Sequence, residues 1–316
     1  MKGKYMELSM QKIFECLEST VNKSILEKFQ NFLKQYPDVD KWFMCSDYCI
    51  GDKNKKNDVI TFVIYPYILN FDDWKKVINN LKHTRLVSDQ FCQFLNQGYC
   101  FSFSFILQKK NYFDGWKRKE AGDMLIQTYI NLTENWQINT PSNAENYKEM
   151  NKKLQKLRNE SRKKNFNYSL FGRMMTICFL AGYLRYLLLR EQKNIKLFSW
   201  LSDRDAITNW NDEIYQTFYH IISHCIIASE QGEEYHRIQE VYLENIKEEI
   251  FYDEMNRVAD YICGTFADFD YTDGSVTGDK QCKMMEDAIS SNNYIIGISV
   301  EEKGVAQICH SKILRE

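Results

Sequence analysis

Lys41-Trp-Phe-Met-Cys-Ser-Asp-Tyr-Cys-Ile50 and Val59-Ile-Thr-Phe-Val-Ile-Tyr65 are the two stretches of the chain that decide its fold. Both are rich in aromatic and β-branched side chains, a composition that favours strands. The residues between them, Gly51-Asp-Lys-Asn-Lys-Lys-Asn-Asp58, are polar and turn-forming, and Pro66 ends the second stretch. Two apolar runs joined by such a loop predict an antiparallel hairpin.

The rest of the chain alternates between strand and helix patterns. Residues 5–36 have apolar positions at helical spacing and predict two amphipathic helices that end near Pro37. Further strands are expected at 99–108, 195–201, 294–300 and 305–309, and helices at 71–82, 88–95, 118–135, 145–164, 168–192, 211–229 and 234–266. This order predicts an α/β fold: a mixed sheet that begins with an antiparallel hairpin and is flanked by helices. We expect a helical extension over 1–38, then a domain over 39–316 with a helical insertion at 118–165.

The composition excludes several classes of protein. The 41 basic and 43 acidic residues leave a net charge of −2, so binding of nucleic acid would need a local basic patch. The 10 cysteines form no Cys-x-x-Cys pair and do not predict a zinc site. The most apolar segment, Met174 to Leu189, contains Arg185 and is too short to span a membrane. No signal-peptide pattern is visible, so we expect a cytoplasmic protein with reduced thiols and no membrane contact.

Four aspartates stand where apolar segments meet loops or lie within them. Asp47 lies inside the first strand, Asp203 and Asp205 follow the strand expected at 195–201, and Asp260 lies in the apolar stretch Val258-Ala-Asp-Tyr-Ile-Cys-Gly264. A carboxylate in such a place is unfavourable unless it is paired or bound to a cation. We therefore expect these side chains, far apart in sequence, to meet around one divalent cation.

Each aspartate also has a simpler interpretation. Asp47 would mark the end of a shorter strand, and Asp203 or Asp205 would cap the following helix. Asp260 would pair with Arg257 or Lys247 in solvent. The sequence leaves these alternatives open.

The segment 145–164 carries the strongest local positive charge. Among its basic residues, Lys152, Lys153 and Lys156 are candidates for contact with a phosphate backbone. The alternative is a solvated helix face, the usual role of such a charge run. A second charged segment, Asp268-Phe-Asp-Tyr-Thr-Asp-Gly274, lacks the spacing of a calcium loop, and we interpret it as a solvated acidic loop.

The order of these motifs resembles a family of RNase H-like proteins of unknown function that is common in bacterial genomes and defence loci. That family carries Asp-Glu-Ser-Gly on an early strand, a later strand that ends in Val-Asp near a basic residue, and Ala-Asp on a C-terminal helix. Here the corresponding residues are Ser46-Asp47-Tyr48, Leu201-Ser-Asp203-Arg204-Asp205 and Val258-Ala259-Asp260. Tyr48 replaces the motif glutamate and Cys49 the serine. The resemblance covers about residues 40–268.

The resemblance implies an RNase H-like, metal-dependent nuclease that hydrolyses RNA or DNA and acts in anti-phage defence. Asp47, Asp203 and Asp260 would be the ligands of Mg²⁺ or Mn²⁺, with Asp205 as a further catalytic residue. Loss of the motif glutamate motivates an alternative: a catalytically inactive RNase H-like subunit that binds nucleic acid or a partner protein. The N-terminal helices offer a contact for such a partner or for a homo-oligomer. A small-molecule enzyme or sensor is a third hypothesis.

Overall fold

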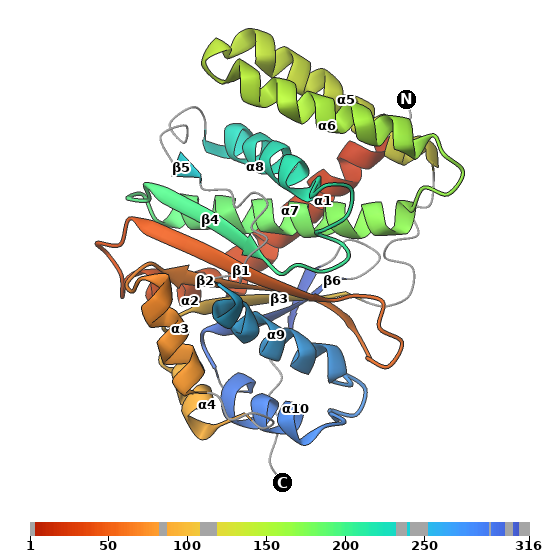
Figure 1. Cartoon of the computed structure of the whole chain (residues 1–316). Helices are drawn as coiled ribbons and strands as arrows, with labels where there is room; N and C mark the ends of the chain where they lie inside the picture. The colour runs from red at the N-terminus through yellow and green to blue at the C-terminus, as the bar shows by residue number, and fades with distance from the viewer. Residues whose placement is uncertain are drawn as a thin grey trace. The chain divides into compact units, whose positions relative to one another are not determined.

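The computed structural model describes residues 4–81, 87–107, 119–231, 239–240, 252–290, 292–300 and 306–309 (Figure 1). The chain forms two compact units. The helical unit comprises Met1–Lys12, Asn111–Leu187 and Arg204–Tyr235, and the sheet unit comprises Ile13–Lys110, Leu188–Asp203 and His236–Glu316. The extension expected over 1–38 therefore belongs to the sheet unit from Ile13 onward, and the insertion expected at 118–165 shares its unit with later helices.

The sheet unit contains a mixed sheet of seven strands in the order β5-β4-β1-β2-β3-β6-β7. The strands are β1 (Lys41–Cys49), β2 (Asp58–Pro66), β3 (Phe101–Leu107), β4 (Leu197–Ser202), β5 (Gln239–Glu240), β6 (Ile295–Val300) and β7 (Ala306–Cys309). The hairpin β1–β2 is antiparallel as predicted, and β3 pairs antiparallel to β2. On the other side of β1, β4 and then β5 run parallel to it. The α/β class, with a mixed sheet and flanking helices, is confirmed.

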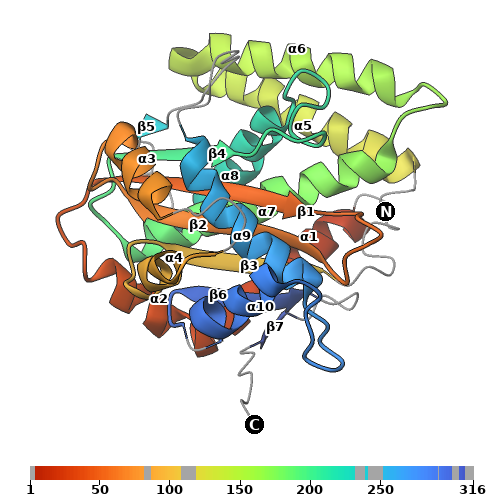
Figure 2. The ribbon, with the colours of Figure 1, turned by 60° about the horizontal axis from the view of Figure 1, so that its bottom comes forward.

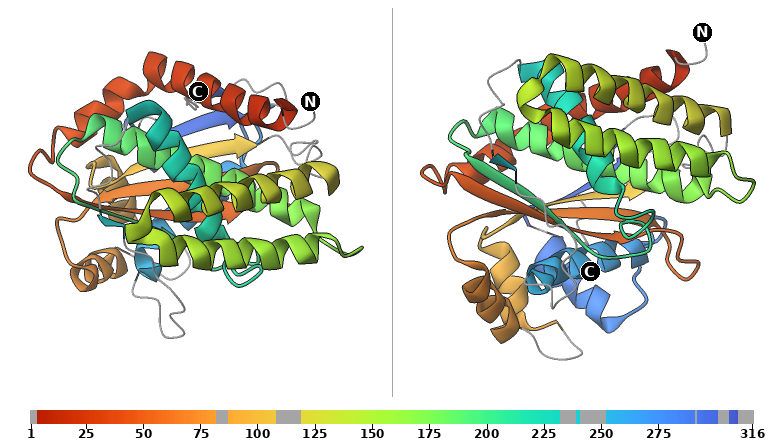
Figure 3. Two further views of the ribbon diagram at one scale, coloured as in Figure 1. Left: turned by 90° about the horizontal axis from the view of Figure 1, so that it is seen from above. Right: turned by 45° about the horizontal axis from the view of Figure 1, so that its top comes forward.

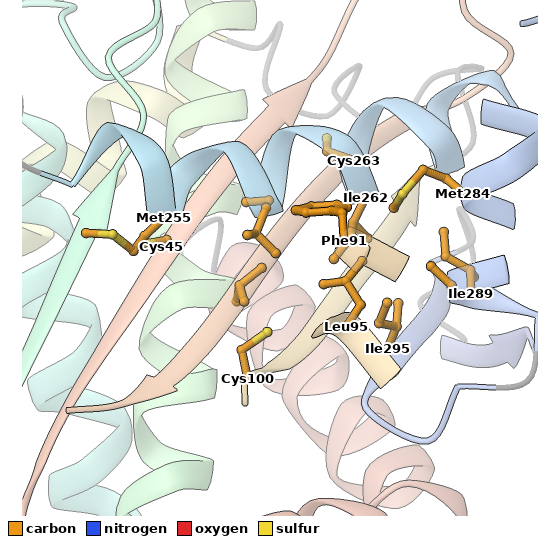
Figure 4. Packing of buried hydrophobic residues seen from close by; sticks show 14 of the residues in the cluster. Cys45, Phe91, Leu95, Cys100, Met255, Ile262, Cys263, Met284, Ile289 and Ile295 are labelled. Atoms are coloured by element: carbon orange, nitrogen blue, oxygen red, sulfur yellow. The ribbon is translucent and has the colours of Figure 1, made fainter. Parts of the chain in front are cut away.

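One face of the sheet is covered by helix α9 (Asp253–Asp268). The odd-numbered side chains of β1 and β2, such as Phe43, Cys45 and Val63, pack in one buried cluster with Met255 and Ile262 of α9. Figure 2 shows α9 crossing the central strands, and Figure 4 shows Met255 beside Cys45 and Ile262 beside Phe91. Helices α3 (Phe71–Asn80), α4 (Asp89–Asn96) and α10 (Asp279–Lys283) complete this side, as the right-hand view of Figure 3 shows. We call it the α9 face.

The opposite face packs against α2 (Leu26–Leu33), which follows the N-terminal helix α1 (Lys4–Ser24). The rings of Phe29 and Phe32 contact Phe101, and the ring of Phe32 also contacts Trp42. Leu17, Val21, Ile25, Phe29 and Phe32 have no solvent exposure. The apolar stripe from Leu17 to Phe32 is thus buried within the chain itself, and its α2 part covers the sheet.

Strand β3 is buried on both sides. Its phenylalanines and its serines alternate, so they project to opposite faces of the sheet. Its phenylalanines meet α2, as the contacts of Phe101 and Phe103 with Phe29 show. Its serines lie on the α9 face, where Ser104 Oγ and Thr61 Oγ1 are 2.9 Å apart in a hydrogen bond. All seven residues of the strand are buried.

The helical unit is built from α5 (Lys119–Asn139), α6 (Ala144–Ser161), most of α7 (Tyr168–Glu191) and α8 (Tyr215–Gln231). Phe218 of α8 contacts both Tyr129 of α5 and Phe171 of α7. Pro141 begins a short 3-10 turn between α5 and α6, at the break predicted from the sequence. None of the helices in the described part of the chain is long and apolar enough to cross a membrane.

The helix expected at 234–266 is wrong at residues 239–240, while 234–238 and 241–251 lie outside the described residues. Gln239 and Glu240 form β5, which pairs parallel to β4, and α9 begins only at Asp253. A two-residue strand has no hydrophobic period of its own, so its pairing with β4 defines it.

Candidate functional site

Asp47 and Asp203 lie beside each other on the α9 face. Asp47 pairs with Thr61 across the hairpin, and Ser46 pairs with Ser202 in the parallel ladder between β1 and β4. The backbone N–H of Asp203 donates to the carbonyl oxygen of Ser46 at 3.0 Å and extends this ladder by one step. Because neighbours in register project to the same face, the carboxylates follow one another across the sheet.

Helix α9 brings the third carboxylate. Asp260 lies on the exposed side of the helix, and Cys263, less than one turn further, is fully buried. The Cys263 thiol donates to the carbonyl oxygen of Val59 at 3.5 Å and also interacts with the carboxylate of Asp47. This flank of α9 therefore faces Asp47, and the electric field of Asp260 reaches it.

The protonation of Asp47 reports how the three acids interact. Burial first, and then the negative charges of Asp260 and Asp203, raise the pKa of the Asp47 carboxyl to about 7. A hydrogen bond with Cys263 opposes the rise of the pKa but does not cancel it. Accumulated negative charge around a half-buried carboxylate is the arrangement that a bound cation would relieve.

A lysine lies on the outer side of the same cluster. The ammonium group of Lys280 stands 3.6 Å from the ring centroid of Tyr261, the neighbour of Asp260. Burial lowers the pKa of Lys280, while the charge of Asp260 opposes that shift and that of Lys55 adds to it. Lys55 itself pairs with the buried Asp268 at 3.2 Å. The sheet unit thus holds positive charge next to its carboxylates.

Asp268 is an exception in the loop that we expected to be solvated, whose residues 271–274 are exposed. It is only 2% exposed, and its carboxylate accepts hydrogen bonds from the backbone N–H and the hydroxyl of Thr277. Next to it, the backbone N–H groups of Lys56 and Asn57 donate to the carbonyl oxygen of Ala267. These contacts fasten the hairpin loop to the end of α9 and so fix the helix against the strand that carries Asp47.

Tyr48, at the position of the family's motif glutamate, lies on the other face of the sheet. Its hydroxyl is 2.6 Å from Ser46 Oγ and 2.7 Å from Ser202 Oγ, and Trp200 Nε1 donates to Ser46 Oγ at 2.8 Å. Strand alternation separates this group from Asp47. A glutamate here would not join the carboxylates of the α9 face, so its absence removes no ligand from them.

Asp205 has the role of a cap. Its Oδ1 accepts from the backbone N–H of Ile207 at 2.8 Å and from that of Thr208 at 2.9 Å, and it belongs to the helical unit. Asp205 thus caps the turn over residues 206–208 and not the following helix, since α8 begins only at Tyr215. Asp260 does not use Arg257 as a partner, since Arg257 pairs with Glu254 at 3.5 Å, and Lys247 lies outside the described residues.

The three candidate lysines lie on α6 of the helical unit. Lys152, Lys153 and Lys156 are all exposed, and Lys156 forms an ion pair with Asp212 of the same unit. These contacts match a solvated helix face. Contact of these lysines with the phosphate backbone of a nucleic acid stays a prediction.

Asp47, Asp203 and Asp260 fit a hard divalent cation in charge and in donor chemistry, since such ions prefer carboxylate oxygens. Among residues that the structure describes, however, no group of three or more His, Cys, Asp or Glu side chains is arranged to hold a metal ion. The charges of Asp203 and Asp260 raise the pKa of Asp47, but the three carboxylates do not form a closed ligand shell.

Sequence reasoning missed Cys263, Lys280 and the pairing partner Thr61. Cys263 was interpretable as a small hydrophobe, and Lys280 has no motif around it. The one available signal was the helical spacing of Asp260 and Cys263, which places both on one flank of α9. In comparisons with protein-family models, curated proteins and solved structures, no match to this chain was found.

Proposed function

We propose that the chain is a nuclease that hydrolyses nucleic-acid phosphodiesters with the help of Mg²⁺ or Mn²⁺, built on an RNase H-like core. The observation that carries the proposal is the gathering of Asp47, Asp203 and Asp260 at one face of the sheet, with the pKa of Asp47 raised by burial and by the charges of the other two. Three acids from two adjacent parallel strands and a covering helix are a donor set suited to phosphodiester chemistry.

The strand order supports the RNase H-like part of the proposal. Strands β3-β2-β1 are antiparallel and are followed by the parallel strands β4 and β5, with Asp47 on β1, the middle one of these five strands. Asp203 lies at the carboxyl end of β4, the edge where open α/β sheets form their ligand sites. The role in anti-phage defence rests on the family resemblance alone.

The chemistry divides between the cation and the side chains. A divalent cation would supply charge stabilisation for the phosphate and activation of the attacking water. Asp47 and Asp203 would hold it from the sheet, and Asp260 from the helix. Hydrogen bonds between the β1–β2 loop and the end of α9 hold the helix that carries Asp260 against the strand that carries Asp47.

The test is an assay of single- and double-stranded RNA and DNA with Mg²⁺, Mn²⁺ or EDTA. Asp260→Asn is expected to lower the cleavage rate about 10-fold or more, because it removes one anionic ligand. Asp205→Asn is the matched control and is expected to keep full activity, since an asparagine oxygen still caps the turn. No metal-dependent cleavage by the wild type, or equal rates for both variants, contradicts the proposal.

Lys280 is proposed to bind a phosphate of the substrate. Lys280→Ala is expected to raise KM about 10-fold with a smaller change in kcat. The slope of log affinity against log salt concentration is expected to become shallower by about one, because one fewer counterion is released. Lys283→Ala is the control, because Lys283 lies on the same short helix but pairs with Asp89. The same KM and salt slope for both variants and the wild type argue against this role.

The alternative, an inactive RNase H-like subunit that binds nucleic acid or a partner protein, has one observation in its favour: the described carboxylates do not form a closed metal site. Calorimetry with Mn²⁺ separates the two functions. The nuclease is expected to bind Mn²⁺ at millimolar concentrations or below, and the inactive subunit is expected to bind none.

A further inference from the structure

Asn256 is a polar side chain of α9 that is buried without a hydrogen-bond partner among the described residues. It lies one helical turn before Asp260 and is only 7% exposed. Neither its Oδ1 nor its Nδ2 has a hydrogen-bond partner in the part of the chain that the structure describes. A buried carboxamide without partners is unfavourable, and native proteins satisfy nearly all such groups.

The surroundings of Asn256 place it at the carboxylate cluster. Tyr252, the residue directly before α9, donates its hydroxyl to the carbonyl oxygen of Ser202 at 3.2 Å, directly before Asp203. Cys263, further along α9, interacts with Asp47. Side chains four residues apart are neighbours on a helix surface. Asn256 therefore lies between the contact with the end of β4 and the contact with β1.

The contrast with Asn292 shows how unusual this is. Asn292 is 5% exposed, and its amide is fully used: Nδ2 donates to the carbonyl oxygens of Leu95 and Ala288, and Oδ1 accepts from the backbone N–H of Tyr294. The same residue type at the same depth in the same unit thus has its partners in one place and lacks them in the other.

We propose that Asn256 is a further ligand of the divalent cation, binding it through Oδ1 as a neutral oxygen donor beside Asp203 and Asp260. The inference rests on the proposed function. An amide oxygen is a suitable donor for Mg²⁺ or Mn²⁺ and adds no charge to a site where carboxylates already repel one another. Binding of the ion would also give the buried amide the partner that it lacks.

Asn256→Leu and Asn292→Leu test the inference in two measurements, urea unfolding in EDTA and calorimetric binding of Mn²⁺. Asn256→Leu is expected to raise the urea midpoint above that of the wild type, because leucine has similar volume and no polar group to satisfy. It is also expected to weaken Mn²⁺ binding about 10-fold. Asn292→Leu is expected to lower the urea midpoint and to leave the affinity for Mn²⁺ unchanged.

Three outcomes separate this inference from the proposed function. A lower urea midpoint for Asn256→Leu with unchanged Mn²⁺ affinity would show that the amide is structural and overturn the inference. If Asp260→Asn weakens Mn²⁺ binding in the same series, the proposed function stands without Asn256. A wild type that binds no Mn²⁺ overturns both.

Discussion

Asp47→Asn is expected to abolish metal-dependent cleavage, lowering kcat by about 100- to 1000-fold. Asparagine keeps the shape of the side chain and its place opposite Thr61 on β2 but removes the negative charge from the centre of the cluster. Initial rates at saturating substrate and Mg²⁺, compared with those of Asp205→Asn, measure the effect. Cleavage at the wild-type rate would remove the nuclease proposal.

The same substitution is expected to stabilise the fold, with a specific pH dependence. The pKa of Asp47 is about 7 in the folded chain and 3.8 for an ordinary aspartate, so folding disfavours its ionised form. Below about pH 4 the carboxyl is neutral in both states and has no effect. Between pH 4 and 7 the unfolded state alone releases the proton, and the free energy of unfolding of the wild type falls as the pH rises.

Asp47→Asn is neutral throughout and avoids this loss. We expect its free energy of unfolding to exceed that of the wild type by about 2–4 kcal/mol at pH 8, and the difference to vanish near pH 4. Urea unfolding in EDTA at several pH values measures it. Saturating Mn²⁺ is expected to stabilise the wild type and narrow the gap, since a ligand of the folded state adds to its stability. A variant less stable than the wild type at pH 8 contradicts the argument.

The hairpin and its acid could be predicted because the information is local. Residues 41–50 and 59–65 carry strand composition, the loop between them carries turn residues, and Gly51 adopts a positive φ of 82°. The register of the hairpin then places Asp47 opposite Thr61. The position of Asp203 after its strand followed from the same pattern. The pairing of β4 with β1, which brings the two acids together, is a tertiary fact that the sequence only suggested.

The rest of the site depends on contacts between distant segments. The placement of Asn256 and Lys280 follows from how α9 and α10 pack, and neither residue belongs to a recognisable motif. Asp268 looks solvated in an acidic sequence, yet Thr277 and Lys55 surround its carboxylate. The alternation of β3 was visible, but it did not reveal that helices cover both faces of the strand.

The packing of the N-terminal helices also could not be predicted from the sequence alone. Their period of apolar residues was clear from the sequence, and α1 and α2 occupy the expected segment. Periodicity says that one face of a helix is buried and does not say against what. In the structure the apolar face of α2 lies against the sheet of its own chain, so α2 supports the strand that carries Asp47.

Phe32→Ala is therefore expected to destabilise the sheet unit strongly, by about 3–5 kcal/mol. The ring is fully buried, and its centroid lies 5.4 to 6.3 Å from those of five other rings: Phe29, Tyr36, Trp42, Phe101 and Tyr294. Its removal leaves a cavity between α2 and two strands that rigid aromatic neighbours cannot fill. Urea unfolding measures the loss, with Ile68→Ala as the control because Ile68 is 41% exposed.

The size of this loss decides between two roles for the N-terminal helices. If they were a separate extension available to a partner, Phe32→Ala would cost less than about 1 kcal/mol, as at an exposed site. If they cover the sheet, the variant loses core packing and also the support of the β1 strand that carries Asp47. Metal-dependent cleavage by Phe32→Ala is then expected to fail at a lower temperature than cleavage by the wild type, while Ile68→Ala follows the wild type.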